Sequence, residues 1–182
     1  SIETIPIHLR SEKGLGYLPQ QRSVFNMTVY DNIMGIAQIS IKGIEIATVE
    51  LTIGIDTFQP ITVSDSSDHV MHSESYNVPE STWNACQSAK RVVAVGTTTV
   101  RSLESAARGN LSGRTDLFLR RGEKFEIVDC IFTNFHLPKS SLLLMIDSFV
   151  GDRWRRLYSE ALAEGYRFLS YGDAMFLQKT VE

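Results

Sequence analysis

The hydrophobic positions alternate with polar ones in some segments and recur at helical spacing in others. Alternation and short apolar runs predict strands at residues 44–53, 69–78, 91–95, 116–119 and 124–129. Helical spacing, with capping residues at its ends, predicts helices at residues 79–89, 97–108, 141–149 and 152–164. Residues 166–177 predict a strand, a turn and a second strand. Because strands alternate with helices, the pattern predicts an α/β fold with a mainly parallel sheet and helices on both of its faces.

The composition is typical of a soluble globular protein. The 182 residues suffice for one domain with a sizeable core, and 43% of them are apolar. No apolar run approaches the roughly 20 residues that span a bilayer, and residues 1–5 lack both parts of a secretion signal. We therefore expect a cytoplasmic protein without a membrane role. Cys86 and Cys130 are expected to be reduced thiols, because no C-x-x-C pair is present.

Charge is unevenly distributed along the chain. The net charge is −3, but residues 90–167 hold 13 Lys and Arg against 9 Asp and Glu, whereas the remainder holds 5 against 12. This distribution permits a local basic face that binds nucleic acid, and scattered surface arginines explain it equally well.

The segment VGTTTVRSLES joins a predicted strand to a predicted helix. Thr97, Thr98 and Thr99 stand where backbone N–H groups lack intrahelical partners and the helix dipole is positive, which favours an anion or a polar ligand. Arg101 would add charge-assisted hydrogen bonds. In the alternative interpretation, one threonine caps the helix and Arg101 forms a surface pair with Glu104.

A second polar loop, TNFHLP, follows a later strand and carries Asn134 and His136. Open α/β sheets bind ligands at this end of their strands, so we expect the two polar loops to lie side by side. His136 could serve as a general acid or base or bind a ligand hydroxyl. It could equally bond to its own loop backbone.

Two further segments offer polar candidates. In HVMHSE, His69 and His72 face opposite sides of a strand and cannot share a metal ion, whereas His72 and Glu74 share a face that could meet substrate. In YRFLSYGDAM, aromatic rings could stack on a purine and a carboxylate could accept from its amine or from a ribose hydroxyl. The same rings could simply fill the core, which is the preferred interpretation of that segment taken alone.

Five motifs together resemble one enzyme family. They are VGTTTVRSLES, TNFHLP followed by an S-x-L-L helix, YRFLSYGDAM, TFQP and DHVMHSE, and they extend from about Ile41 to about Leu177. The chain is similar to the S-adenosylmethionine:tRNA ribosyltransferase-isomerases of queuosine biosynthesis. This resemblance implies transfer and isomerisation of the ribosyl part of S-adenosylmethionine onto 7-aminomethyl-7-deazaguanine at the tRNA wobble position, giving epoxyqueuosine-tRNA, adenine and methionine. S-Adenosylmethionine is then a consumed cosubstrate, a tRNA carrying that base is the partner, and neither a cofactor nor a metal is implied.

The resemblance also implies a fold and roles for the polar residues. The fold is the family's C-terminal, Rossmann-like part without its inserted β-barrel domain. The substrate-binding candidates are Thr97, Thr98, Thr99, Arg101, Asn134, Arg167, Tyr171 and Asp173. The catalytic candidates, which could accept a proton near C5′ of the ribose, are His136, His72 and Glu74.

Four positions depart from the family pattern. Thr52 replaces a histidine, Asp56 replaces a glycine, Arg121 replaces a proline, and Asp147 stands in a predicted helix where a small neutral residue is customary. An aspartate in that apolar run would be costly to bury without a partner.

Residues 1–40 resemble a different protein. They are similar to the glutamine-loop region of ATP-binding cassette ATPases of the lipopolysaccharide-export type, with Gln20 as the loop glutamine. No Walker A, signature or Walker B segment accompanies them, so ATP hydrolysis is not expected. We interpret the chain as this fragment, not an independent domain, joined to the family's α/β part at residues 41–182. The alternative to activity is an inactive fragment or fusion product with at most residual nucleoside or tRNA binding.

Overall fold

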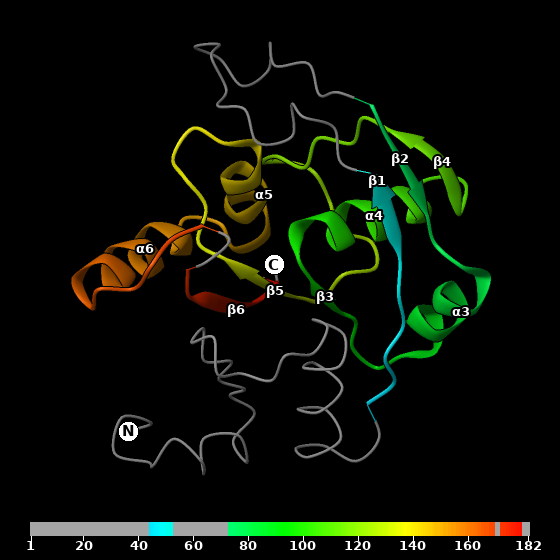
Figure 1. The fold of residues 1–182 in the computed structure, drawn as a ribbon, viewed down its shortest axis with the longest axis horizontal. Helices are drawn as coiled ribbons and strands as arrows, with labels where there is room; N and C mark the ends of the chain where they lie inside the picture. Colours follow the sequence, from blue (N-terminus) through cyan, green and yellow to red (C-terminus); the bar gives the residue numbers. More distant parts are fainter. Residues whose placement is uncertain (1–43, 53–72, 170–171, 180–182) are drawn as a thin grey trace. The chain divides into compact units, whose positions relative to one another are not determined.

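One helix lies between two small sheets in the computed structural model of the chain (Figure 1). The structure describes residues 44–52, 73–169 and 172–179, and those from Ala47 onward belong to one compact unit. The strands are β1 (Glu50–Thr52), β2 (Glu74–Asn77), β3 (Val93–Val95), β4 (Ser112–Thr115), β5 (Cys130–Asn134) and β6 (Ala174–Gln178). The helices are α3 (Glu80–Ser88), α4 (Thr97–Ala107), α5 (Ser141–Val150) and α6 (Arg153–Ala163). The helix between the sheets is α4.

All four predicted helices are confirmed, with ends close to those predicted. Capping explains why α5 begins where it does. Ser140 occupies the N-cap, and its Oγ accepts a hydrogen bond from the Leu143 N–H at 3.2 Å. The capping serine therefore fixes the start of this helix, whereas α3, α4 and α6 begin without a side-chain cap.

The sheets are not mainly parallel, which corrects the prediction. One sheet has the order β1-β2-β4 and is antiparallel throughout, and the other has the order β3-β5-β6. Of the strands that the structure describes, β3 and β5 form the single parallel pair, whereas β5 and β6 are antiparallel. The reason is that α5 and α6 follow each other without a strand between them. After two helices the chain returns along β5 in the opposite direction.

Two predicted strands, at residues 116–119 and 124–129, do not form. The backbone N–H groups of residues 126–128 donate to the side-chain carboxylate of Glu104 instead of to a neighbouring strand. Residues 166–169 also form no strand, and of the closing segment only β6 pairs with a neighbour. In residues 124–129 the apolar alternation correctly identified Phe125 and Val128 as buried. There the Glu104 carboxylate accepts the backbone N–H groups that a neighbouring strand would otherwise bind.

Packing around α4 determines which faces of the sheets are covered. Helix α4 is buried along most of its length because it contacts both sheets. Towards it, the β3-β5-β6 sheet presents Ala94 and Ile131, which are fully buried. The opposite face of that sheet carries Val93, Val95 and Phe176, which are 44–49% exposed. Helices on both faces are therefore not observed in the described residues, which corrects the prediction.

No helix within the described residues is long and apolar enough to cross a bilayer. The two cysteines form no disulfide with each other: Cys86 is half-buried and Cys130 is buried. Burial raises the pKa of the Cys130 thiol, so this cysteine packs as a small apolar residue.

Candidate functional site

The two polar loops lie side by side, as predicted. Since β3 and β5 are parallel neighbours, the chain leaves both strands at the same edge of the sheet. The Gly96 N–H donates to the Phe132 carbonyl at 2.8 Å, which joins the start of one loop to the end of the other strand. We call this region, made of residues 96–99, 134–136 and 172–173, the carboxyl edge.

The corner after β3 leaves the start of α4 without a capping side chain. Gly96 stands at the N-cap with φ 91°, a conformation that favours glycine. The Thr99 hydroxyl donates back to the Val95 carbonyl at 2.7 Å, so the interpretation in which a threonine caps the helix is wrong. A ligand oxygen can therefore accept hydrogen bonds from the first N–H groups of α4. Of the three hydroxyls at the corner, Thr97 is buried, whereas Thr98 and Thr99 are half-buried.

Arg101 is buried, so the surface pair with Glu104 is also wrong. Its Nη1 donates to the Glu74 carboxylate and its Nε donates to the Leu117 carbonyl at 3.3 Å. Its Nη2 is buried and has no hydrogen-bond partner in the described part of the chain. Leaving a buried donor without a partner costs about 1–3 kcal/mol, or more for a charged group. A hydrogen bond to an anionic or polar group would satisfy this nitrogen.

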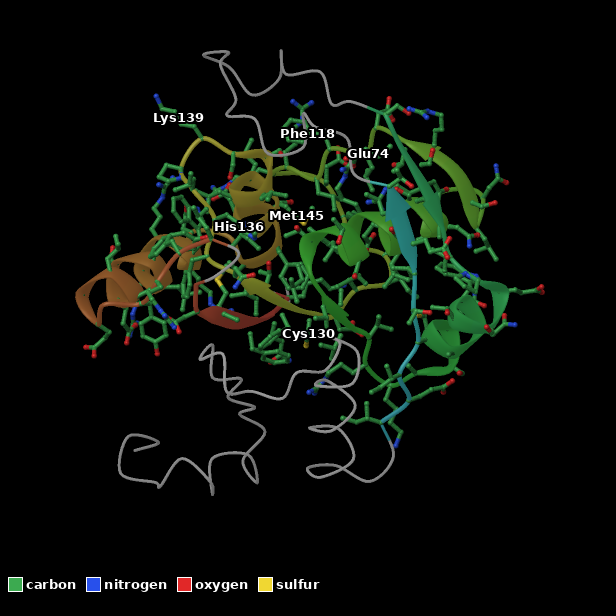
Figure 2. All side chains as sticks on the ribbon, viewed as in Figure 1. Glu74, Phe118, Cys130, His136, Lys139 and Met145 are labelled. Atoms are coloured by element: carbon green, nitrogen blue, oxygen red, sulfur yellow. The ribbon has the colours of Figure 1, made fainter. Side chains whose placement is uncertain are left out.

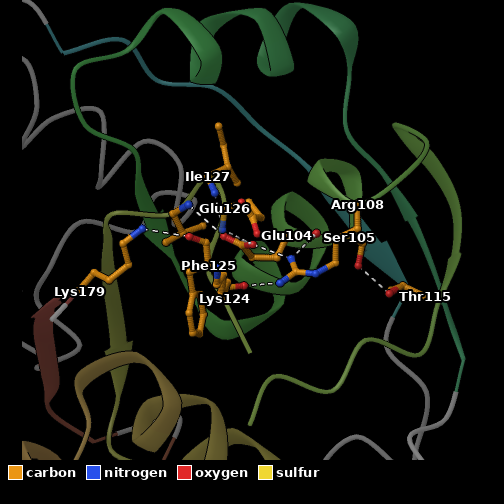
Figure 3. A network of polar contacts seen from close by, with 10 residues as sticks. Glu104, Ser105, Arg108, Thr115, Lys124, Phe125, Glu126, Ile127 and Lys179 are labelled. Carbon is orange, nitrogen blue, oxygen red and sulfur yellow. Dashed lines mark hydrogen bonds and ion pairs between the residues drawn. The ribbon is translucent and has the colours of Figure 1, made fainter. Parts of the chain in front are cut away.

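Glu104 is a buried polar residue that sequence reasoning assigned to the surface (Figure 3). Its carboxylate accepts three backbone N–H groups, those of residues 126, 127 and 128, at 2.8–3.1 Å. Arg108 Nη1 donates to the same carboxylate at 2.7 Å. Glu104 therefore fixes the segment that leads into β5. Helical spacing could have found it, because Glu104 lies four residues after the buried Val100 on the same face of α4.

His136 is held in its neutral form. Burial lowers the pKa of His136 to about 4. Its Nε2 lies 3.0 Å from the Thr133 hydroxyl, and its backbone N–H donates to the Tyr158 hydroxyl at 2.9 Å. Burial also raises the pKa of Tyr158 to about 12, so that hydroxyl stays protonated. At neutral pH the imidazole can accept a proton, and its low pKa makes it a weak base.

Asn134 positions the turn before β6. Its Nδ2 donates to the carbonyls of Gly172 and Asp173, both at 3.2 Å. Asp173 Oδ2 in turn accepts the Arg167 N–H at 2.7 Å, and Arg167 Nε lies 3.7 Å from it. A Cβ at Gly172 would overlap backbone atoms of Arg167 and Phe168, so this turn needs glycine. The amide of Asn134 therefore holds the turn, which brings Asp173 to the carboxyl edge.

Two of the departures from the family pattern bind each other. Arg121 Nε and Nη2 donate to the two carboxylate oxygens of Asp147 at 2.7 and 2.9 Å. The Trp154 indole N–H donates to the same carboxylate. Burial alone would raise the pKa of Asp147, but the hydrogen bonds from Arg121 and Trp154 outweigh burial and lower it. The aspartate is therefore paired, and the two departures compensate each other.

The structure does not bring together the two catalytic candidates that it describes, Glu74 and His136. Glu74 pairs with Arg101 on the side of α4 that faces the β1-β2-β4 sheet, whereas His136 follows β5 (Figure 2). Several predictions lie outside the described residues. They are the candidates His69, His72 and Tyr171, the family departure Asp56, and the fragment of residues 1–40 with its Gln20. Among the residues that are described, no group of three or more His, Cys, Asp and Glu side chains could hold a metal ion.

The fold is mixed α/β, and the carboxyl edge lies where two parallel strands end, the place at which open α/β sheets bind ligands. A model of the family described as queuosine biosynthesis protein matches residues 32–177. The S-adenosylmethionine:tRNA ribosyltransferase-isomerase of Dichelobacter nodosus is 45% identical over 150 residues, which cover 77% of this chain and 42% of that protein. The enzyme of the same name from Thiobacillus denitrificans is 49% identical over 147 residues, covering 76% and 43%. The chain belongs to the queuosine biosynthesis protein family.

A solved structure supports the same assignment. The S-adenosylmethionine tRNA ribosyltransferase of Thermotoga maritima matches with a TM-score of 0.54 and 45% identity, covering 57% of this chain and 40% of that one. The chain spans about two fifths of the length of the curated relatives described above. The family match begins at residue 32, and the boundary at residue 40 stays a prediction.

Proposed function

We propose that the chain supplies the C-terminal α/β part of an S-adenosylmethionine:tRNA ribosyltransferase-isomerase. The reaction would move the ribosyl part of S-adenosylmethionine onto 7-aminomethyl-7-deazaguanine in tRNA and isomerise it, releasing adenine and methionine. The observation that carries the proposal is the 45–49% identity to relatives with this name. The matched residues include both loops of the carboxyl edge.

The carboxyl edge offers groups that suit this cosubstrate. S-Adenosylmethionine carries a carboxylate, which the uncapped N–H groups of α4 could bind. Arg101 lies outside the carboxyl edge, beside Glu74, and its Nη2 is a separate candidate for an anionic group of the ligand. The half-buried hydroxyls of Thr98 and Thr99 and the carboxylate of Asp173 are suited to ribose hydroxyls or the adenine amine. Arg167 and Tyr171 remain candidates for the same pocket.

Proton transfer is assigned to His136 in this proposal. The aminomethyl group must attack as a neutral amine, and a proton must leave near C5′ of the ribose, so the site needs an acceptor. His136 is neutral at physiological pH because burial lowers its pKa to about 4. Glu74 is bound by Arg101 and keeps that guanidinium in place, and His72 remains a second candidate base. The proposal requires neither a metal nor a separate cofactor.

A second candidate function is binding without turnover. It is favoured by the length of the match, because the chain spans only 42–43% of the relatives. In that case the carboxyl edge would retain nucleoside binding, while the groups needed for catalysis would lie in the part of the relatives that is not matched.

Adenine release separates the two candidates. The chain is incubated with S-adenosylmethionine and a tRNA that carries the aminomethyl-deazaguanine, and adenine is measured by chromatography. A tRNA with unmodified guanine at the same position is the control. The proposal predicts adenine release that requires the modified base and falls at least tenfold in H136Q. Binding of S-adenosylmethionine without adenine release, at high protein concentration, would support the second candidate.

A further inference from the structure

We propose that α6 and the residue that follows its C-terminal turn form a docking surface for single-stranded RNA. We call this surface the α6 ridge, and it consists of Arg153, Arg155, Arg156 and Tyr166. Phosphates would bind to the arginines at one end, and an unpaired base would stack on Tyr166 at the other. The inference rests on the proposed function, because it names the surface through which the tRNA would reach the carboxyl edge.

Of the three arginines at the start of α6, Arg155 lies over the Trp154 ring and near Asp152, whereas Arg153 and Arg156 have no role in folding that the structure reveals. Residues 153–156 contain three arginines and no acidic residue. They stand at the positive end of the helix dipole, where acidic side chains are the favourable ones. Arg153 and Arg156 are exposed and make no hydrogen bond, ion pair or ring contact within the described residues. Glu160, one turn after Arg156, forms no ion pair with it either.

Counting the charges around this end of α6 leaves a positive surplus. The groups are the four arginines Arg121, Arg153, Arg155 and Arg156 and the two aspartates Asp147 and Asp152. Arg121 binds both aspartates, and Arg155 lies 3.8 Å from Asp152. Both carboxylates are thus matched, and two positive charges remain on Arg153 and Arg156. A polyanion is the ligand that complements such a surplus.

Tyr166 provides an aromatic surface at the other end of α6. Its N–H donates to the Ala161 carbonyl at 2.9 Å, which holds it against the end of the helix. Tyr166 is 47% exposed as a residue, and its ring meets the Phe135 ring edge to face, with 5.8 Å between the centroids. The eleven residues of α6 span about 16 Å. About five nucleotides of a stacked strand cover this length at 3.4 Å each.

The ridge leads to the carboxyl edge. Phe135, which Tyr166 contacts, precedes His136 in the chain, and the Tyr158 hydroxyl on α6 accepts the His136 N–H. Leu137 lies in the loop that carries His136, and Leu169 lies in the segment that carries Tyr166; both are about half exposed. A base stacked on Tyr166 would therefore be close to the residues that the proposed reaction uses. In Figure 1, α6 is the orange helix beside the loop that follows β5.

RNA fits the ridge better than a membrane does. A helix that lies on a membrane carries large apolar side chains along one exposed face and basic ones beside them. Of the large apolar residues that are exposed in the described part of the chain, only Leu162 belongs to α6. Exposed arginines that share a surface with an exposed aromatic residue are instead the combination that binds single-stranded nucleic acid.

The test is the binding of a fluorescently labelled RNA hairpin with an unpaired loop, measured by anisotropy over a range of salt concentrations. The full chain is compared with R153E/R156E and with the matched control K90E/R91E. The control makes the same charge change where the chain enters β3, at the opposite end of the strand from the carboxyl edge. We expect R153E/R156E to lower the affinity about tenfold or more and to reduce the salt slope by about 1.4, because each lost phosphate contact of a single strand accounts for about 0.7. K90E/R91E should change both quantities much less.

Tyr166 is tested with two variants that both preserve bulk. Y166F keeps the ring and should bind as the unmodified chain does, whereas Y166L should bind the hairpin about fivefold or more weakly. Neither variant should affect binding of a blunt RNA duplex, which offers no unpaired base. Equal losses in Y166F and Y166L would overturn the stacking role.

Three outcomes would overturn the ridge itself. They are equal weakening by both double variants, no RNA binding by the unmodified chain, and preferential binding to vesicles that contain phosphatidylserine. The assay needs no S-adenosylmethionine and no turnover, so it separates the ridge from the reaction. RNA binding that depends on the α6 ridge, without adenine release, would support the docking surface and contradict the proposed reaction. Adenine release with an unchanged KM for tRNA in R153E/R156E would support the proposed reaction and contradict the docking surface.

Discussion

Replacing Glu104 by glutamine tests whether one buried carboxylate holds the segment that leads into β5. One carboxylate oxygen accepts the N–H groups of Ile127 and Val128 at 3.1 and 3.0 Å, and the other accepts the Glu126 N–H at 2.8 Å and Arg108 at 2.7 Å. A glutamine amide has only one oxygen, so its NH2 group must face two of these donors. Removing one partner of a buried ion pair costs about 3–5 kcal/mol. Because the Arg108 side chain is 29% exposed, we expect E104Q to lower the free energy of unfolding by about 3 kcal/mol.

Urea unfolding followed by circular dichroism measures this change. E126Q is the matched control, because Glu126 is exposed and its replacement should change the free energy of unfolding by less than about 0.5 kcal/mol. Hydrogen exchange of the chain without substitutions provides a second measurement that does not depend on a folded variant. The amides of residues 126–128 should be protected as strongly as those of β5. An E104Q variant as stable as E126Q, or rapid exchange of these three amides, would refute the reasoning.

Three further predictions concern the surroundings of the site. Burial lowers the pKa of His136 from 6.5 to about 4. The stability that the neutral imidazole contributes is therefore present above pH 6.5 and is lost as the pH falls towards 4. In urea unfolding, the free energy of unfolding should change by about 3 kcal/mol over this pH range, and H136Q should lack that change. D147N should lower the free energy of unfolding by about 1–2 kcal/mol at pH 7. This difference should shrink as the pH falls below about 4, because the lowered pKa of Asp147 gives stability only while the carboxylate is ionised. In a double-mutant cycle, the effects of D147N and R121Q on the free energy of unfolding should not be additive. Y158F removes the acceptor of the His136 N–H and should cost about 1–3 kcal/mol at every pH from 6 to 9, so an unchanged urea midpoint would contradict this contact.

The sequence predicts local structure well where a single residue determines it. Ser140 sets the start of α5 through one hydrogen bond. The alternation of strands and helices also places the threonine corner next to the Asn134 loop, because two parallel strands end at one edge. Both features depend on residues that are close in sequence or on one strand pairing.

Features that depend on distant residues could not be read from the sequence. No feature of the sequence near Glu104 indicates that three N–H groups more than twenty residues away donate to its carboxylate. For this reason the prediction of a strand at residues 124–129 is wrong. The burial of Arg101 follows from the position of Glu74 on another element. Arg121 supplies the partner that makes Asp147, expected to be costly when buried alone, part of a favourable contact.

The central claim is that the carboxyl edge holds S-adenosylmethionine, and amide chemical shifts measured during a titration test it most directly. The chain is labelled with nitrogen-15, and S-adenosylmethionine is added in steps, with methionine and adenosine as separate controls. We expect the largest shifts on the carboxyl edge, at residues 96–99, 134–136 and 172–173. R101K should weaken the binding of S-adenosylmethionine more than that of adenosine if Arg101 also binds the ligand. Saturable shifts confined to other parts of the chain, or no shifts at millimolar S-adenosylmethionine, would contradict it.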